Sequence, residues 1–548
     1  MSKQEHRLVE EFLTGQMSRR ELIRGLMAAG LSVSAIGGLL ASTGISDRAE
    51  AESLVEAQHA TVKKGGTPVF TTLAPASDVD PVTLFSEGGV FTGQICLEYL
   101  CFPRKNYTLE PKLATSWHSK QPNQWTFNLR QGVKWHDGTH FTADDVVATF
   151  DRLTDPKVNS AALSAFKGIL SKGHTRKNSS HQVTFHLDRP YVDFPYLVSA
   201  FTYNSFILPK NYKIGDFVKG KIGTGPFVLT KYTSKVGATY VANKHYWAKG
   251  LPHVDGINLK YYSDNTAQVL ALQSGAADVL LDMPYQGSQA VFSSSDINVL
   301  SIPSSAYRGF HMRVDQKPFN DKRVRQAVAY CMDRGALVQG LWHGFASQAN
   351  DHPFAPIFPT SVLPIAHLPQ RHQNYPMAKK LLAEAGHPNG FKATITTESF
   401  LEIPQYAVFI QQQLKPAGID ITLNVEPQPT YFGTGANQPW LDVPVGIVDW
   451  APRGTASQLI GPAYLCKGIW NSAHWCNASF NKYLAEYDSE LNLGKRKKIA
   501  LQAAKVMYDE TPEIIAYWIK ELRAMRKHVH GMAVSSFALV DPTKIYLS

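Results

Sequence analysis

The chain has 548 residues, which is too long for one ordinary hydrophobic core and predicts two or three domains. Hydrophobic residues make up 44% of the chain and charged residues 18%, a globular composition that excludes a largely disordered protein. Lys and Arg total 55 against 45 Asp and Glu, which gives a net charge of +10. The sequence has no basic run with interleaved aromatic residues, the pattern expected for nucleic-acid binding. We therefore favour a basic soluble protein over a nucleic-acid-binding one.

The first 51 residues have the pattern of an export signal. A charged segment precedes 22 uncharged residues, 25–46, that are rich in Ala, Gly, Ser and Leu, and a small-residue cleavage site follows at Ala49-Glu50-Ala51. Residues 18–24 (Ser-Arg-Arg-Glu-Leu-Ile-Arg) resemble the twin-arginine motif. A permanent membrane anchor is the alternative, which the Gly and Ser content disfavours. Because no Cys follows closely enough to carry a lipid, we predict a soluble periplasmic protein of a Gram-negative cell.

Residues 109–153 carry the most informative pattern. Residues 125–130 alternate apolar and polar side chains, as a half-buried strand does. A turn follows at 133–138, which contains Asp-Gly. Thr142 then suits the N-cap of a helix whose apolar face begins at Val146. The segment contains no nucleophile–base pair and no metal-ligand spacing.

The same segment resembles the signature of the family 5 extracellular solute-binding proteins of ABC importers, the dipeptide, oligopeptide and nickel group. The matching positions, in family order, are Pro111, Leu113, Ala114, Trp117, Phe127, Leu129, Arg130, Gly132, Val133, Trp135, His136, Asp137, Gly138, Phe141, Ala143, Asp145 and Val146. So many matches in one order make a chance resemblance improbable.

Further landmarks of this family occur in the expected order along the chain. The predicted elements are a strand at 67–73, a helix at 89–102, a strand at 183–187, a tight turn at 222–227, a helix at 267–277 that stops at Gly275, a helix at 318–330 capped by Asn320 or Asp321, a helix at 378–386 and a helix–turn–strand unit at 409–423. Cys331 follows Val324 and Val328 on one helix face, which favours a packed thiol over a reactive one.

The resemblance covers about residues 63–548 and implies an α/β fold of the two-lobed periplasmic-binding-protein (Venus flytrap) type with an extra inserted domain. We therefore expect a signal peptide at 1–51, a linker at 52–66, a discontinuous first lobe at 63–107, 222–306 and 512–548, an inserted domain at 108–221 and a second lobe at 307–511. Ligands of such folds bind in the cleft between the lobes.

Residues 447–454 (Ile-Val-Asp-Trp-Ala-Pro-Arg-Gly) form the first candidate ligand-binding segment. In peptide-binding relatives the matching loop carries an Asp that pairs with the α-amino group of the ligand. Aligning Trp450 on the Trp of that loop places Arg453 at the Asp position. A guanidinium suits a carboxylate or phosphate and not an ammonium. Asp449 could supply the negative charge one step earlier, and a structural Asp449–Arg453 pair is the alternative.

Three further features complete the candidate site. Cys466 and Cys476 bracket a short loop, which in an exported protein predicts a disulfide, and some dipeptide-binding relatives have a similar loop that ends in Trp-Cys. Trp470 inside this loop either faces the ligand or packs in the core, and Tyr431 is a weaker candidate for ligand contact. Cys96 and Cys101 are spaced poorly for bridging on the predicted helix, so buried thiols are expected there.

The resemblance implies the substrate-binding component of an ABC transporter, which captures a small molecule or short peptide and delivers it to a permease with two ATPase partners. We expect a monomer without cofactor or metal. The alternatives are a dipeptide or oligopeptide receptor of general specificity and, with less support, a nickel-chelate, opine or sugar receptor. An enzyme is disfavoured because the sequence has no GxSxG, HExxH, GxGxxG or P-loop pattern, and its His residues are scattered.

Overall fold

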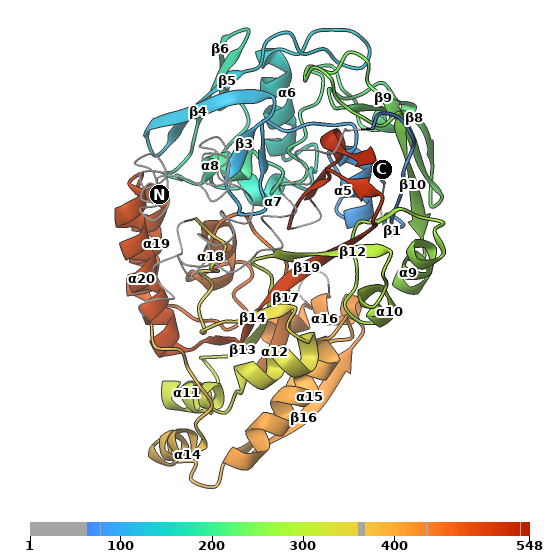
Figure 1. Cartoon of the computed structure of the whole chain (residues 1–548). Coiled ribbons are helices and arrows are strands. Elements are labelled where there is room, and N and C mark those ends of the chain that lie inside the picture. Colours follow the sequence, from blue (N-terminus) through green and yellow to red (C-terminus); the bar gives the residue numbers. More distant parts are fainter. Residues whose placement is uncertain (1–62, 77, 360–367, 434–436, 537–538) are drawn as a thin grey trace, which may run out of the picture. The chain divides into compact units, whose positions relative to one another are not determined.

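The computed structural model describes residues 63–76, 78–359, 368–433, 437–536 and 539–548. The predicted signal peptide and most of the predicted linker lie outside these ranges. Within them the chain is a mixed α/β structure with three sheets of four or more strands (Figure 1). The predicted α/β class is therefore confirmed.

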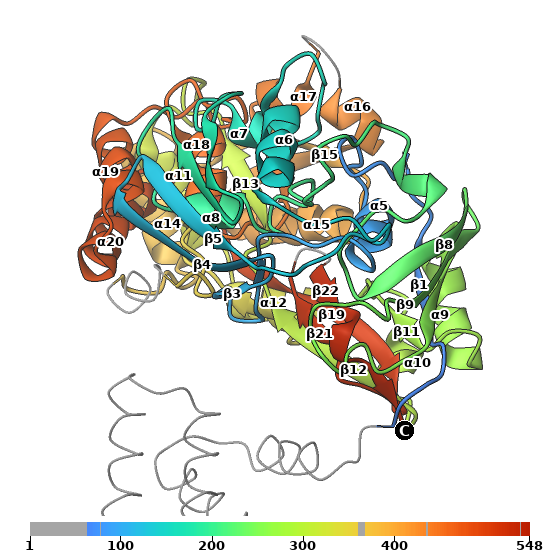
Figure 2. The same ribbon diagram turned by 90° about the horizontal axis from the view of Figure 1, so that it is seen from above.

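The largest sheet combines strands that lie far apart in the sequence. Its order is β12-β19-β11-β1-β10-β9-β8, and β14 pairs with β19 outside this path. The strands are β1 (Val69–Leu73), β8 (Phe227–Thr233), β9 (Gly237–Ala242), β10 (Gly256–Tyr262), β11 (Val279–Leu280), β12 (Ile297–Pro303), β14 (Ala346–Gln348) and β19 (Tyr517–Arg526). β1 pairs in parallel with both β10 and β11, and helix α9 (Asn265–Ser274) packs beside them, as Figures 1 and 2 show.

A second, five-stranded sheet has the order β16-β15-β17-β13-β18. The strands are β13 (Tyr307–Met312), β15 (Phe391–Glu398), β16 (Ile419–Glu426), β17 (Val445–Trp450) and β18 (Glu513–Ile515). Helix α15 (Ile403–Leu414) packs on β15 and β16. Its apolar face is buried at Ile403, Tyr406, Ala407, Ile410 and Leu414, the spacing of one helix face.

The chain crosses between these two sheets twice. At the first crossing, β12 ends at Pro303 in the large sheet and β13 begins at Tyr307 in the second sheet. At the second crossing, the chain passes from β18, which pairs with β13, to β19, which pairs in the large sheet. The two crossings are tied together, because the backbone N–H of Ile519 donates to the carbonyl of Ala306 at 2.8 Å and the Ser304 hydroxyl donates to the carbonyl of Ile519 at 2.7 Å. β18 thus pairs in the second sheet, although our expected boundary placed residue 512 and onwards in the first lobe.

The family signature builds a third sheet with the order β4-β5-β7-β6. The strands are β4 (Ala114–Gln121), β5 (Gln124–Leu129), β6 (Thr175–Ser179) and β7 (Gln182–His186). Burial alternates along β5 as its sequence predicts. Helix α6 (Ala143–Thr154) begins after Thr142, whose backbone N–H donates to Asp145 Oδ2 at 2.8 Å, so the predicted capped helix is confirmed.

Two of the family landmarks meet in space. The backbone N–H of His136 donates to the carbonyl of Gly223 at 2.9 Å, and the N–H of Gly225 donates to the carbonyl of Cys96 at 3.0 Å. A Cβ on Gly223 would lie 2.2 Å from that Cys96 oxygen, and its φ of +135° favours glycine. The turn at 222–227 therefore closes directly over the chain that follows helix α5 (Glu87–Gln94).

This contact explains an error in the sequence analysis. The predicted helix at 89–102 ends at Gln94, and residues 101–103 form strand β2. The apolar residues there continue a helical pattern, but the backbone of Cys96 is engaged by the glycine turn and β2 pairs with β3 (Leu109–Pro111). Long-range backbone contacts thus override the local helical preference.

The other predicted helices are present with small shifts of their ends. Helix α9 stops at Gly275 with a φ of +81°, α11 (Lys322–Tyr330) is capped by Asp321, and Cys331 is buried beside α11. The remaining elements are α7 (Leu163–Phe166), α8 (Phe194–Leu197), α10 (Gln289–Phe292), α12 (Arg334–Trp342), α14 (Tyr375–Glu384), α16 (Gln428–Phe432), α17 (Pro439–Asp442), α18 (Ser457–Tyr464), α19 (Ala478–Ser489), α20 (Leu493–Glu510), β20 (Val529–His530), β21 (Ala533–Ser535), β22 (Leu539–Asp541), β23 (Tyr546–Leu547) and three 3-10 helices, Phe217–Lys219, Lys415–Ala417 and Pro542–Lys544.

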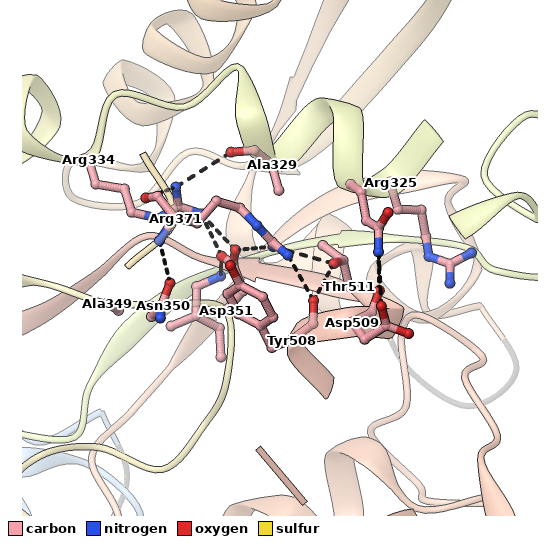
Figure 3. Close-up of polar contacts among 12 residues, drawn as sticks. Arg325, Ala329, Arg334, Ala349, Asn350, Asp351, Arg371, Tyr508, Asp509 and Thr511 are labelled. Atoms are coloured by element: carbon pink, nitrogen blue, oxygen red, sulfur yellow. Dashed lines mark hydrogen bonds and ion pairs between the residues drawn. The ribbon is translucent and has the colours of Figure 1, made fainter. Parts of the chain in front are cut away.

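A buried ion cluster anchors the second crossing strand (Figure 3). The Asp351 carboxylate, fully buried, accepts from Arg334 Nη2 at 2.7 and 2.8 Å and from Arg371 Nη1 at 2.5 Å. Asp351 also accepts from the backbone N–H of Ile515 in β18 at 3.2 Å. The cluster therefore connects Arg334 of α12, Asp351, Arg371 and the strand that passes between the two large sheets.

Candidate ligand-binding site

Three separate parts of the chain line an open cavity of about 970 Å³. They are residues 85–90 around the start of α5, residues 161–204 after α6, and residues 451–488 from the end of β17 to α19. A cavity of this size is typical of sites for small molecules and short peptides. The glycine at 454 lets the walls approach, because a Cβ there would lie 2.4 Å from the Phe201 ring.

Arg453 lines this cavity. Its backbone N–H donates to Ser305 Oγ at 2.8 Å, and its Nη1 donates to the carbonyls of Ala451 and Pro452 at 3.2 and 2.9 Å. The guanidinium carbon lies 5.7 Å from the Trp470 ring centroid, a cation–π distance. Burial lowers the pKa of Arg453, although an arginine stays charged at any physiological pH. The cation is thus held in place with its loop fixed to the crossing segment before β13.

Trp470 also lines the cavity, from the loop between Cys466 and Cys476. The sulfur atoms of these two cysteines lie 2.07 Å apart, the separation of a disulfide bond. Trp470 packs with its ring centroid 6.2 Å from that of Trp450. Trp470 therefore borders the cavity and packs against the core, and its contact with a ligand stays a prediction.

Trp450 is not one of the described residues that line the cavity. It is buried, and its Nε1 donates to Glu513 Oε1 at 2.9 Å. Glu513 is itself fully enclosed and accepts from the Tyr464 hydroxyl, and burial raises its pKa to about 7. The Trp450 ring packs against the Trp470 ring, and Trp450 itself is not part of the described cavity lining. Ligand contact by Trp450 therefore stays a prediction.

Asp449 faces another partner. It lies opposite Arg308 across strands β17 and β13 and forms an ion pair with Arg308 Nη1. Arg308 Nε also pairs with Glu402 Oε1 at 2.7 Å. Asp449 is absent from the described cavity lining, and the ion pair with Arg308 accounts for its position at the strand end. Its predicted role as a ligand contact remains untested.

Tyr431 lies in helix α16 and is fully buried. Its hydroxyl has no hydrogen-bond partner among the described residues, and a Cβ on Gly446 would lie 2.7 Å from this oxygen. Burial raises the pKa of Tyr431 well above its usual value. Tyr431 is not part of the described cavity wall, so its ligand contact also stays a prediction.

Cations outnumber carboxylates in the cavity wall. The charged lining residues are Lys167, Arg189, Arg453 and Lys467 against Glu87 and Asp488. Arg189 and Asp488 neutralise each other through an ion pair of 2.8 Å. Glu87 has exposed surface toward the cavity yet lies deep among protein atoms, and burial together with the neighbouring Asp282 raises its pKa well above the usual value. The wall consequently favours a negatively charged group.

Several lining residues were missed by the sequence analysis. Phe85 and Glu87 lie shortly after Asp80-Pro81, a dipeptide that favours a turn, and this is the sequence signal that could have indicated a surface segment there. Arg189, Phe201 and the residues of α19 carry no such signal. They reach the cavity because the segment after β7 packs against the chain after β17, where Arg189 pairs with Asp488 and Phe201 lies against Gly454.

The described residues contain no group of three or more His, Cys, Asp or Glu side chains that could hold a metal ion. Two of the scattered histidines, His311 and His352, are at most 1% exposed and belong to the core. This burial lowers the pKa of His311 to about 3 and that of His352 to about 4. Nor does any helix in the described ranges have the length and apolar character needed to cross a bilayer.

The crossing strands and the cavity lined by three parts of the chain define a two-lobed binding-protein fold, and solved structures of that class match it. HbpA2 from Haemophilus parasuis is 23% identical with a TM-score of 0.77, covering 88% of this chain and all of that one. The periplasmic binding protein DppA from Helicobacter pylori, in complex with the peptide STSA, is 22% identical with a TM-score of 0.70, covering 90% of this chain and 99% of that one.

A family model described as bacterial extracellular solute-binding proteins, family 5, middle, matches residues 108–469, more than half of the chain. The chain belongs to this family. The glutathione-binding protein GsiB of Escherichia coli (strain K12) is 27% identical over 512 residues, which cover 90% of this chain and 95% of that protein. The protein is accordingly the substrate-binding component of an ABC transporter and not an enzyme.

Proposed function

We propose that the captured solute is a peptide or peptide-like molecule with an anionic group, and that Arg453 contacts this group beside Trp470. The observation that carries the proposal is the cationic cavity wall, in which Arg453 stands fixed by two carbonyls and a tryptophan ring. A guanidinium recognises a carboxylate through two parallel hydrogen bonds. The names of the relatives support the class, since GsiB is called glutathione-binding and the DppA structure contains a peptide.

The role of Arg453 is tested by Arg453→Ala. The solute is first identified by native mass spectrometry of protein purified without added ligand, followed by analysis of whatever denaturation releases. Calorimetric titration of that solute should then show at least about tenfold weaker binding to Arg453→Ala, since one charge-assisted contact is worth about 1.5–3 kcal/mol. Arg104→Ala is the matched control, because Arg104 is an exposed arginine outside the cavity wall. Equal affinities of wild type and Arg453→Ala would remove Arg453 from the site.

The second candidate function is a peptide receptor of general specificity. It is supported by the peptide in the DppA structure and by the large apolar part of the cavity wall. In that case native mass spectrometry should release a mixture of short peptides, and Arg453 would act only in holding its loop. A single acidic compound would instead favour the first candidate.

We also propose that residues 1–51 direct export by the twin-arginine route and are removed, so that the exported protein starts near Glu52. The mature protein would act as a soluble periplasmic monomer without a lipid, and its partners would be a permease and two ATPases. N-terminal sequencing of exported protein tests the cleavage, and an intact Met1 would contradict it.

A Cys466–Cys476 disulfide belongs to the same proposal and is supported by the sulfur distance. Non-reducing peptide mapping should link these two cysteines and leave Cys96, Cys101 and Cys331 as thiols, which are buried.

The proposed domain division keeps the first lobe at 63–107, 222–306 and 512–548, the inserted domain at 108–221 and the second lobe at 307–511. Strands β1, β8 to β12 and β19 support the first lobe, β4 to β7 the inserted domain, and β13 and β15 to β17 the second lobe. Expression of residues 307–511 without their neighbours should give an incomplete sheet, because β18 pairs with β13 from outside this range.

A further inference from the structure

Two large apolar side chains are exposed on the cavity wall. Phe85, just before α5, has 61% of its surface exposed, and Ile469, inside the Cys466–Cys476 loop, has 62%. In the described part of the chain, the other large apolar residues with comparable exposure lie outside this cavity. Exposed apolar surface inside a binding cavity favours a ligand that covers it.

The wall around these two residues is also largely apolar. It includes Val90 from α5, Ile169 and Leu197 from the segment after α6, and Leu465 at the end of α18. Val90 and Leu197 are almost completely buried in the surrounding core, so these side chains form a fixed surface. An apolar ligand group placed here loses contact with water without requiring the wall to rearrange.

The cavity wall presents both charged and apolar side chains. Arg453 and Trp470 are partly buried and contact each other, while Phe85 and Ile469 are mostly exposed. Lys167 and Lys467 also line the wall, and neither ammonium forms an ion pair with another described residue. The partly buried cation suits a negatively charged group of the solute, and the exposed apolar side chains suit an apolar part of the same molecule.

We propose that the solute is amphipathic, with a carboxylate and an apolar body, and that Phe85 and Ile469 determine specificity for that body. This rests on the proposed function and narrows its solute class. Hydrophobic peptides and acylated or aryl-substituted acids fit the description, whereas small hydrophilic peptides would leave the apolar wall exposed. Covering the exposed part of one such side chain is expected to strengthen binding about fivefold or more.

The test uses matched probes on the exported protein. Calorimetric titration compares trileucine, triglycine, trileucine amide and octanoate, which differ in apolar body and in the carboxylate. Trileucine should bind at least about tenfold tighter than triglycine and than trileucine amide. Phe85→Ala and Ile469→Ala should each weaken trileucine about fivefold and leave triglycine unchanged. Leu270→Ala is the control, because Leu270 is 58% exposed on α9 and lies outside the cavity wall.

The outcomes separate this inference from the proposed function. Similar affinities for trileucine and triglycine, both weakened by Arg453→Ala, would overturn the apolar specificity and keep the anionic contact. Equal binding of trileucine and its amide, with no effect of Arg453→Ala, would overturn both. Failure of trileucine and octanoate to bind at concentrations up to about 1 mM would also overturn the amphipathic class.

Discussion

Replacement of Asp351 by Ala should destabilise the protein strongly, because this carboxylate is the shared partner of two buried guanidinium groups (Figure 3). The side chains of Arg334, Arg371 and Asp351 have at most 2% of their surface exposed. Loss of the carboxylate would leave two positive charges in an environment from which water is excluded. The variant would also remove the acceptor for the backbone N–H of Ile515 in β18.

The structure allows the size of this effect to be stated. Removal of one member of a buried ion pair typically costs about 3–5 kcal/mol. Two cations are affected here, but each keeps another partner, since Arg334 Nη1 donates to the carbonyl of Arg371 at 3.0 Å and Arg371 Nη2 donates to that of Tyr508 at 2.9 Å. We therefore expect Asp351→Ala to lower the free energy of unfolding by about 4–5 kcal/mol. Asp351→Asn keeps the volume and one acceptor oxygen, so it should cost less, about 3 kcal/mol.

Urea unfolding followed by tryptophan fluorescence measures both variants against the wild type. The matched control is Asp144→Ala, which breaks the Lys177–Asp144 pair, whose side chains are 41% and 42% exposed. An exposed pair near a helix start contributes at most about 1 kcal/mol. If Asp351→Ala destabilises the protein no more than Asp144→Ala does, the cluster does not anchor the crossing strand and the reasoning fails.

Substitutions at Glu513 and Gly223 test two buried contacts by their effect on the free energy of unfolding. Burial raises the pKa of Glu513 from 4.5 to about 7, so this carboxyl stabilises the fold fully below pH 4.5, and that contribution is lost as the pH rises through about 7. The free energy of unfolding of the wild type should therefore fall as the pH rises from 4.5 to 8, and in Glu513→Gln this fall should be smaller by up to about 3 kcal/mol. Urea titrations in which Glu513→Gln keeps the pH dependence of the wild type would contradict this. Gly223→Ala should destabilise the protein by more than about 2 kcal/mol in the same assay, whereas Gly250→Ala, with φ +81° and no atom within 4 Å of the added Cβ, should cost about 1 kcal/mol. Equal effects of the two glycine variants would show that the contact with Cys96 is unimportant.

Local elements followed from the sequence because local chemistry specifies them. The alternation in β5, the cap at Thr142 and the stop at Gly275 depend on neighbouring residues in the chain, and the structure has them where the pattern predicts. The helix expected at 89–102 was wrong beyond Gln94, since a turn more than 120 residues later in the chain engages the Cys96 backbone. No local pattern contains that contact.

The sequence by itself determined the family and the α/β class, because the signature positions are legible along the chain, and it singled out the segment around Arg453 and Trp470 as a candidate for ligand contact. Only the tertiary structure decided which of those side chains border the cavity. It placed Arg453 and Trp470 in the wall and directed Asp449 to Arg308 and Trp450 to Glu513. Neighbouring residues on a strand point to opposite faces, so their partners depend on what the fold brings against each face. Phe85 and Ile469 border the cavity as well, through packing between segments distant in the sequence.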